Sequence, residues 1–177
     1  ITLDTKGEKL VAGNRTLLKF KVSSNGDAIA WNKIIIGVTK TAANTIADGA
    51  RLVDSATQTV VATLAAGDSD CEGAAATCTM TVLLAGGAEE QVSGEKTYEL
   101  KGTVGGTLAL NSYIAPQISN TAVAKATNTN AVITGVGTNS FVWSDISAQA
   151  HDVATTADWT NEFLVKTFPV SQTLTVK

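Results

Sequence analysis

The sequence is poor in several residue types, and each scarcity limits what the chain can do. Its 177 residues include one histidine, two prolines and two cysteines, and charged residues make up 16%, where about 25% is typical of soluble domains. The net charge is −3 and no basic cluster is present, so the electrostatic signature of nucleic-acid binding is missing. No apolar run approaches the roughly 20 residues that span a bilayer. We expect no nucleic-acid partner and no membrane span.

The two cysteines, Cys71 and Cys78, lie in a small polar loop rich in glycine and alanine. Their spacing is not that of a CxxC redox site, and a zinc site needs more ligands than the one distant histidine adds. Apolar runs at 57–64 and 79–84 flank the loop, and we read them as the arms of a hairpin. We predict a disulfide closing that hairpin end, with free thiols as the alternative. Disulfides persist in oxidising compartments, which favours an extracellular, cell-surface location.

Alternating apolar and polar residues predict strands along most of the chain. In residues 16–22, Leu18, Phe20 and Val22 point one way, and Lys19 and Lys21 point the other way. Further strand signals lie at 28–38, 51–54, 57–64, 79–84, 96–104, 107–114, 131–136, 140–143, 163–167 and 170–176. Pro116 is expected to end the segment 107–114. Nine or more short strands without helical periodicity predict an all-β sandwich, immunoglobulin-like or jelly-roll, as one domain over residues 1–177.

The sequence does not display a catalytic constellation. His151 is the one available imidazole base, but the nearby Ser144 and Ser147 lie in no nucleophile elbow. Asp145, Asp152 and Asp158 are near in sequence, which alone builds no triad. We expect a non-enzymatic protein without a cofactor, in which His151 packs beside Trp143 or Trp159.

Acidic residues alternate in the cysteine loop, where Asp68, Asp70 and Glu72 form a candidate Ca²⁺ site. The EF-hand pattern is absent, and a solvated acidic loop is the alternative reading. The three tryptophans could form a sugar-stacking platform. We instead expect Trp31 to be core, and Trp143 and Trp159 to form a structural aromatic cluster with His151.

Two stretches resemble known surface proteins. Residues 7–38, GEKLVAGNRTLLKFKVSSNGDAIAWNKIIIGV, and residues 91–106, QVSGEKTYELKGTVGG, are similar to surface-exposed β-sandwich domains of bacteria and archaea. Residues 141–177 resemble the C-terminal ending of predicted secreted surface proteins of uncultivated candidate-phylum bacteria. The matching positions are Trp143, Ser144, Asp145, Ser147, Ala148, His151, Asp158, Trp159, Asn161, Val165, Lys166 and Pro169. The resemblance implies an extracellular surface role, supplies no catalytic residues, and suggests that Lys177 is close to the natural C-terminus.

The functional expectation is a structural subunit of an extracellular assembly, filament- or pilus-like or surface-layer-like. The chain begins at Ile1 without Met, so we expect a processed form or a cut fragment, and removal of a secretion signal fits the cysteine argument. Ile1, Thr2 and Leu3 form an apolar, alternating start that could add to a neighbour's sheet. The expected partners are copies of the chain itself or other surface proteins. The alternatives are pairing of both ends within their own domain and, for function, an adhesin or carbohydrate-binding module.

Overall fold

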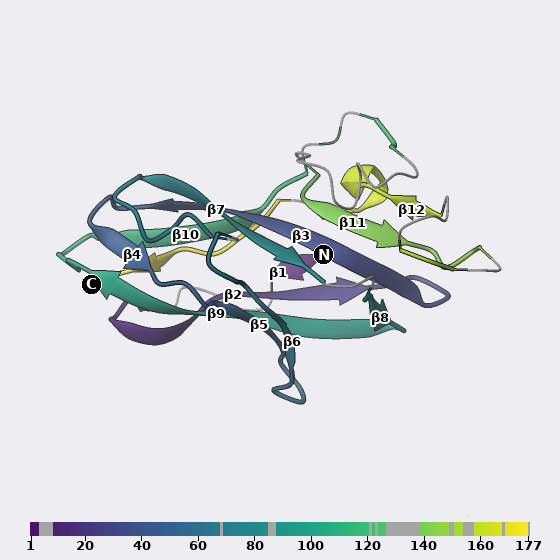
Figure 1. Ribbon diagram of the computed structural model, residues 1–177, viewed down its shortest axis with the longest axis horizontal. Coiled ribbons are helices and arrows are strands. Elements are labelled where there is room, and N and C mark those ends of the chain that lie inside the picture. The colour runs from purple at the N-terminus through teal and green to yellow at the C-terminus, as the bar shows by residue number, and fades with distance from the viewer. Residues whose placement is uncertain are drawn as a thin grey trace.

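The computed structural model shows two antiparallel β-sheets packed face to face as a sandwich (Figure 1). It describes residues 1–3, 9–67, 69–84, 88–120, 122, 124–126, 139–148, 151–153, 158–167 and 169–176. The first sheet contains β1 (Thr2–Leu3), β2 (Gly13–Ser23), β4 (Asn44–Ile46), β5 (Arg51–Asp54), β6 (Val60–Thr63) and β9 (Glu95–Gly106). The second contains β3 (Ile29–Lys40), β7 (Thr77–Leu83), β8 (Glu90–Val92), β10 (Tyr113–Ile118), β11 (Phe141–Ser144), β12 (Trp159–Thr160), β13 (Val170–Ser171) and β14 (Leu174–Thr175). The predicted all-β sandwich is confirmed.

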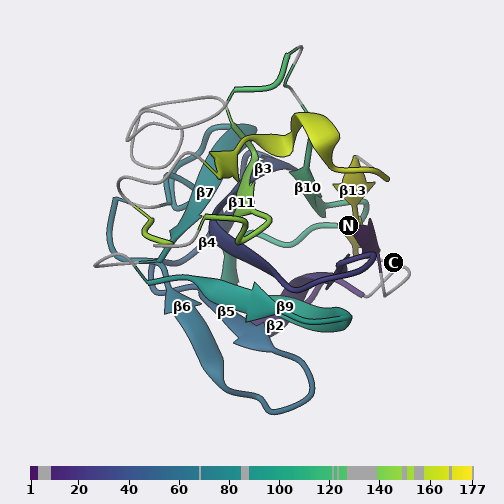
Figure 2. The same ribbon diagram turned by 90° about the vertical axis from the view of Figure 1, so that its right-hand side faces the viewer.

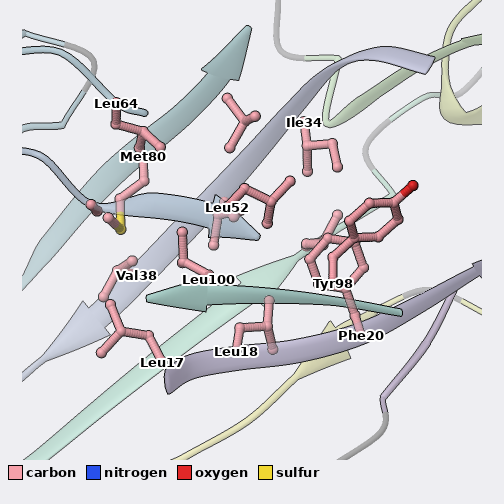
Figure 3. Packing of buried hydrophobic residues seen from close by; sticks show 14 of the residues in the cluster. Leu17, Leu18, Phe20, Ile34, Val38, Leu52, Leu64, Met80, Tyr98 and Leu100 are labelled. Carbon is pink, nitrogen blue, oxygen red and sulfur yellow. The ribbon is translucent and has the colours of Figure 1, made fainter. Parts of the chain in front are cut away.

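The first sheet is built around the pairing of β2 with β9. Its register runs from Gly13 opposite Val104 to Ser23 opposite Glu95. As the alternation predicted, Leu18, Phe20 and Val22 are buried. Side chains from both sheets meet in one core, in which Figure 3 shows Leu17, Leu18, Phe20, Tyr98 and Leu100 facing Ile34, Val38 and Met80.

The central strand β3 changes face at a bulge. In its pairing with β11, Lys33 lies opposite Val142 but Trp31 lies opposite Trp143, so Asn32 is an extra residue. An extra residue reverses the alternation, which lets Trp31 and Ile34 both point into the main core. The Asn32 amide holds the bulge by donating to the carbonyls of Leu84 and Ala88, at 3.3 and 2.7 Å. The prediction that Trp31 is a core residue is confirmed, and its side chain is fully buried.

The prediction that the runs on either side of the cysteine loop form a hairpin is wrong. The two runs belong to different sheets, because β6 pairs with β5 in the first sheet whereas β7 pairs with β3 in the second. The turn at 54–59 explains why β6 pairs with β5. There the Asp54 carboxylate accepts hydrogen bonds from the Ala56 and Thr57 amides and brings β5 and β6 together. The cysteine loop is therefore a crossover between the sheets.

The prediction that Pro116 ends a strand is wrong, because Pro116 lies inside β10 opposite Val38. The strand begins later than predicted, at Tyr113, and residues 107–112 form a connection. The other neighbours of β10 are β13 and β14, which pair with Gln117–Ile118 and Tyr113–Ile114 respectively. Proline has no N–H to donate to a ladder, and Pro116 lies at the gap between these two short strands. Its carbonyl still accepts from the Gln172 amide.

The segment after β11 adds a third layer. The strand expected at 163–167 is instead the short 3₁₀ helix η2 (Glu162–Leu164), begun by Asn161, whose side-chain oxygen caps the Phe163 amide. Figure 2 shows η2 on the side of the second sheet that faces away from β2 and β9. A small second cluster, Ala30, Val142, Val153 and Trp159, is buried beneath this layer. The strand predicted at 131–136 lies outside the described residues.

Candidate functional site

A groove of about 1100 Å³ opens at the end of the sandwich where β2 connects to β3. Figure 2 looks onto this end of the molecule. Apolar side chains from both sheets, from the loop after β11 and from η2 line the groove; they include Val22, Ile29, Phe141, Trp143, Ile146 and Leu164. Polar residues at the same walls include Asn25, Asp27, Gln91 and Asp145. The groove therefore joins an apolar interior to a polar rim, which is typical of a binding site.

The predicted assembly strand lies at this groove. Ile1 is 8% exposed, belongs to the main core and lines the groove, and its nitrogen donates to the Lys166 carbonyl at 3.2 Å. Thr2 and Leu3 form β1, opposite Lys21 and Phe20 of β2, and both are exposed. In the single chain this segment is thus the edge strand of its own first sheet.

His151 connects two carboxylates from distant parts of the chain. Its Nδ1 lies 2.8 Å from Asp158 Oδ2, and its Nε2 lies 2.6 Å from Glu89 Oε2. The imidazole stacks on Trp159, with ring centroids 5.3 Å apart. Burial alone would lower the pKa of His151, but the hydrogen bonds to Asp158 and Glu89 outweigh burial and raise the pKa above its ordinary value. The arrangement favours the imidazolium form, which donates to both acids.

A serine, an aspartate and a histidine meet here, but in an order that differs from a catalytic triad. The Ser144 hydroxyl donates to Asp158 Oδ2 at 2.8 Å, and its oxygen accepts from the Ile146 amide at 2.9 Å. In a triad the histidine lies between the serine and the acid. Here Asp158 lies between Ser144 and His151, and both ring nitrogens already have carboxylate partners. The cluster is suited to holding the third layer against the sandwich.

The structure brings His151 and Trp159 together but leaves Trp143 in a different cluster. In the pairing of β11 with β12, Trp159 lies opposite Ser144, and Thr160 lies opposite Trp143. Neighbouring residues of a strand point to opposite faces, so Trp143 and Ser144 cannot face the same side. Trp159 is fully buried in the second cluster, whereas Trp143 is half-buried against the main core and donates to the Asn161 carbonyl at 3.2 Å.

The cysteine loop contains the predicted disulfide between Cys71 and Cys78, with Cα atoms 5.1 Å apart. Of the Ca²⁺ candidates, Asp68 lies outside the described residues. Asp70 accepts a hydrogen bond from the Thr79 amide, and Glu72 accepts one from the Asp48 amide at 2.9 Å. These two carboxylates therefore cap different backbone segments around the loop.

Sequence reasoning missed the partner of His151 and the buried amine beneath the disulfide loop. Glu89 is 62 positions away from His151 in a glycine-rich turn, and nothing in its surroundings indicates a histidine. Lys40 is 1% exposed and donates to the carbonyls of Asn44 and Gly73, each at 2.7 Å. Burial lowers the pKa of Lys40, against the opposing effect of the Asp70 charge. A terminal lysine of a strand reads as exposed unless a later loop folds over it.

Within the described part of the chain, no helix has the length and apolar character needed to cross a membrane. Comparison of the chain with protein-family models, with curated proteins and with solved structures found no match.

Proposed function

We propose that the protein is a non-enzymatic structural subunit of an extracellular assembly at a cell surface, which polymerises through its N-terminal strand. The observation that carries the proposal is the position of β1. This two-residue strand is the edge strand of the first sheet and pairs with β2 at Lys21 and Phe20, beside a groove that Ile1 lines. Exposed strand edges are templates for pairing with another chain.

The energy balance of β1 supports exchange between subunits. Burying the Ile1 side chain contributes roughly 1.5–3 kcal/mol. Ordering the backbone of three residues costs about 1–2 kcal/mol per residue, and Thr2 and Leu3 recover little of that cost because both are exposed. The segment is therefore held weakly by its own domain, and an equivalent contact with a neighbour can replace it.

Two further features are consistent with a structural role outside the cytosol. The Cys71–Cys78 disulfide favours an oxidising compartment. The connectivity of Ser144, Asp158 and His151 gives the histidine no serine proton to accept, which supports a non-enzymatic reading.

The experiment compares the parent chain with a variant lacking residues 1–7. We expect filaments or larger oligomers of the parent by negative-stain microscopy and light scattering, and a folded monomer after truncation. Urea unfolding of the truncated variant serves as the control for folding. Unchanged polymers after truncation would exclude terminal strand addition, and a parent that stays monomeric at every concentration would overturn the structural role.

A binding module, such as an adhesin or carbohydrate-binding domain, is a second candidate because of one observation. The half-buried Trp143 lines the groove together with Asn25, Asp27 and Gln91, and an aromatic face beside hydrogen-bonding groups can stack on a sugar ring. Titration of the monomer with oligosaccharides would quench the fluorescence of Trp143 if this function holds. The variant Trp143→Phe, with Trp31 and Trp159 retained, would then lose the response.

A further inference from the structure

The edge of β2 beside the groove is longer than the segment that pairs with it. On its other side β2 pairs with β9 from Gly13 to Ser23. On the groove side, among the strands that the structure describes, β1 is its partner and reaches Phe20 and Lys21. This edge offers a ready template for strand addition, and its register is already defined by β1.

The groove has room for more than Ile1. Its volume of about 1100 Å³ is at the upper end of pockets that hold a small organic ligand. Leu164 of η2 lines the groove and is 49% exposed, and Phe163, the residue before it in η2, is 42% exposed. Exposed apolar groups gathered at a groove mark an interaction surface.

The occupant is indicated by the chain itself, because Ile1 already packs against the groove wall from the same molecule. A contact that closes within one chain can also form between two identical chains, as in domain swapping. We propose that the groove and the edge of β2 form the acceptor site for Ile1–Leu3 of a second copy, which replaces the acceptor's own β1, with the donor's Thr2 opposite Lys21 and its Leu3 opposite Phe20. This inference rests on the proposed function and specifies the site at which assembly occurs.

The link between β1 and the body limits how the subunits meet. Six peptide steps join Leu3 to Lys9, and fully extended they span at most about 20 Å. The donor's body must therefore lie against the acceptor within that reach of the groove. Each subunit carries one donor segment and one acceptor site, so the contact is head-to-tail and generates an open filament or a ring.

The test uses two variants that each carry one added cysteine, so that a bond between the added cysteines can form only between two molecules. Thr2→Cys protein is mixed with Lys21→Cys protein under mild oxidation, and the interchain products are identified by mass after proteolysis. The native pair Cys71 and Cys78 is already bonded and buried, so it does not compete. Lys19→Cys is the matched control, because Lys19 and Lys21 project from the same face of β2 and Lys19 lies out of register.

We expect the bond between positions 2 and 21 as the major interchain product and none between positions 2 and 19. The double variant Thr2→Cys/Lys21→Cys, oxidised as a dilute monomer, should be locked and unable to polymerise. Polymers that form without the 2–21 bond, or from the locked monomer, would overturn the acceptor site while leaving the structural role intact. Absence of both polymers and interchain bonds would overturn the acceptor site and the proposed function together.

Discussion

The indole nitrogen of Trp31 donates a hydrogen bond to the phenol oxygen of Tyr98 across the two sheets, at 3.3 Å. The two rings meet edge to face, at 90° and with centroids 5.6 Å apart. The Tyr98 hydroxyl in turn donates to Glu90 at 3.1 Å, and Glu90 pairs with Lys96 at 2.8 Å. Burial raises the pKa of Tyr98 well above its ordinary value, so the phenol stays neutral and can donate. A polar chain thus crosses an otherwise apolar core.

Replacing Tyr98 by phenylalanine should destabilise the sandwich by about 1–3 kcal/mol, because it leaves the buried Trp31 N–H without an acceptor. Urea unfolding followed by tryptophan fluorescence measures the change. Tyr113→Phe is the control, since the Tyr113 hydroxyl makes no hydrogen bond within the described part of the chain. Equal unfolding midpoints for the two variants would contradict a stabilising role for this hydrogen bond.

The His151 cluster should make stability depend on pH near neutrality. The pKa of His151 is raised in the folded state, so its contribution is fully present below the unfolded value of about 6.5 and is lost as pH rises through the folded value. We expect the free energy of unfolding of the parent to fall, relative to that of His151→Gln, which does not titrate, as the pH rises above about 6.5. Urea unfolding at a series of pH values measures this difference, and parallel curves for the two proteins would refute it.

Local sequence patterns predicted the strands that alternate most regularly. They did not predict which strands, distant in sequence, pair with one another. The run 16–22 alternates and became β2 because one face of a sheet is buried whatever strand lies beside it. The runs 57–64 and 79–84 are equally regular, yet pattern alone does not distinguish neighbours in one sheet from strands of two sheets. At Trp31 the expected burial was right, although a bulge, which the sequence does not mark, produces it.

The candidate site was predictable only in part, for the same reason. Cys71 and Cys78 are close in sequence, and their bond follows from spacing. The pairing of His151 with Glu89 depends on how the third layer lies over the second sheet, which no local signal reports. Trp143 and Trp159 were expected to share one cluster, but strand register directs them to opposite faces.

Reduction of the disulfide should destabilise the protein by roughly 2–3 kcal/mol, the chain-entropy value for a loop this short. Intact-mass spectrometry should show an increase of about 2 Da on reduction, as expected for one S–S bond. Unfolding of the double variant Cys71→Ala/Cys78→Ala checks the energy independently of the reductant. Alkylation of both cysteines in the unreduced, unfolded protein would show that the bond is absent.

Two glycines of similar backbone geometry should respond differently to alanine. Gly106 has φ of +80° and a Cβ there would lie 2.1 Å from the Ala43 carbonyl oxygen, whereas Gly94 has φ of +75° and open space. Both substitutions strain the backbone, but Gly106→Ala also drives β9 and β4 apart. We expect it to destabilise the protein by about 1–3 kcal/mol more than Gly94→Ala. Thermal unfolding of both variants measures the difference, and matching losses would argue against close packing at Gly106.

The crossover loop has a consequence for proteolysis. Residues 72–77 are all exposed, while the cysteines at both ends are buried. A protease that cuts between Cys71 and Cys78 breaks the polypeptide, but the two fragments stay joined through sulfur. They also stay paired in both sheets, through β2 with β9 and β3 with β7. A nicked molecule would therefore keep its size in a non-reducing gel and separate into two pieces only when reductant is added.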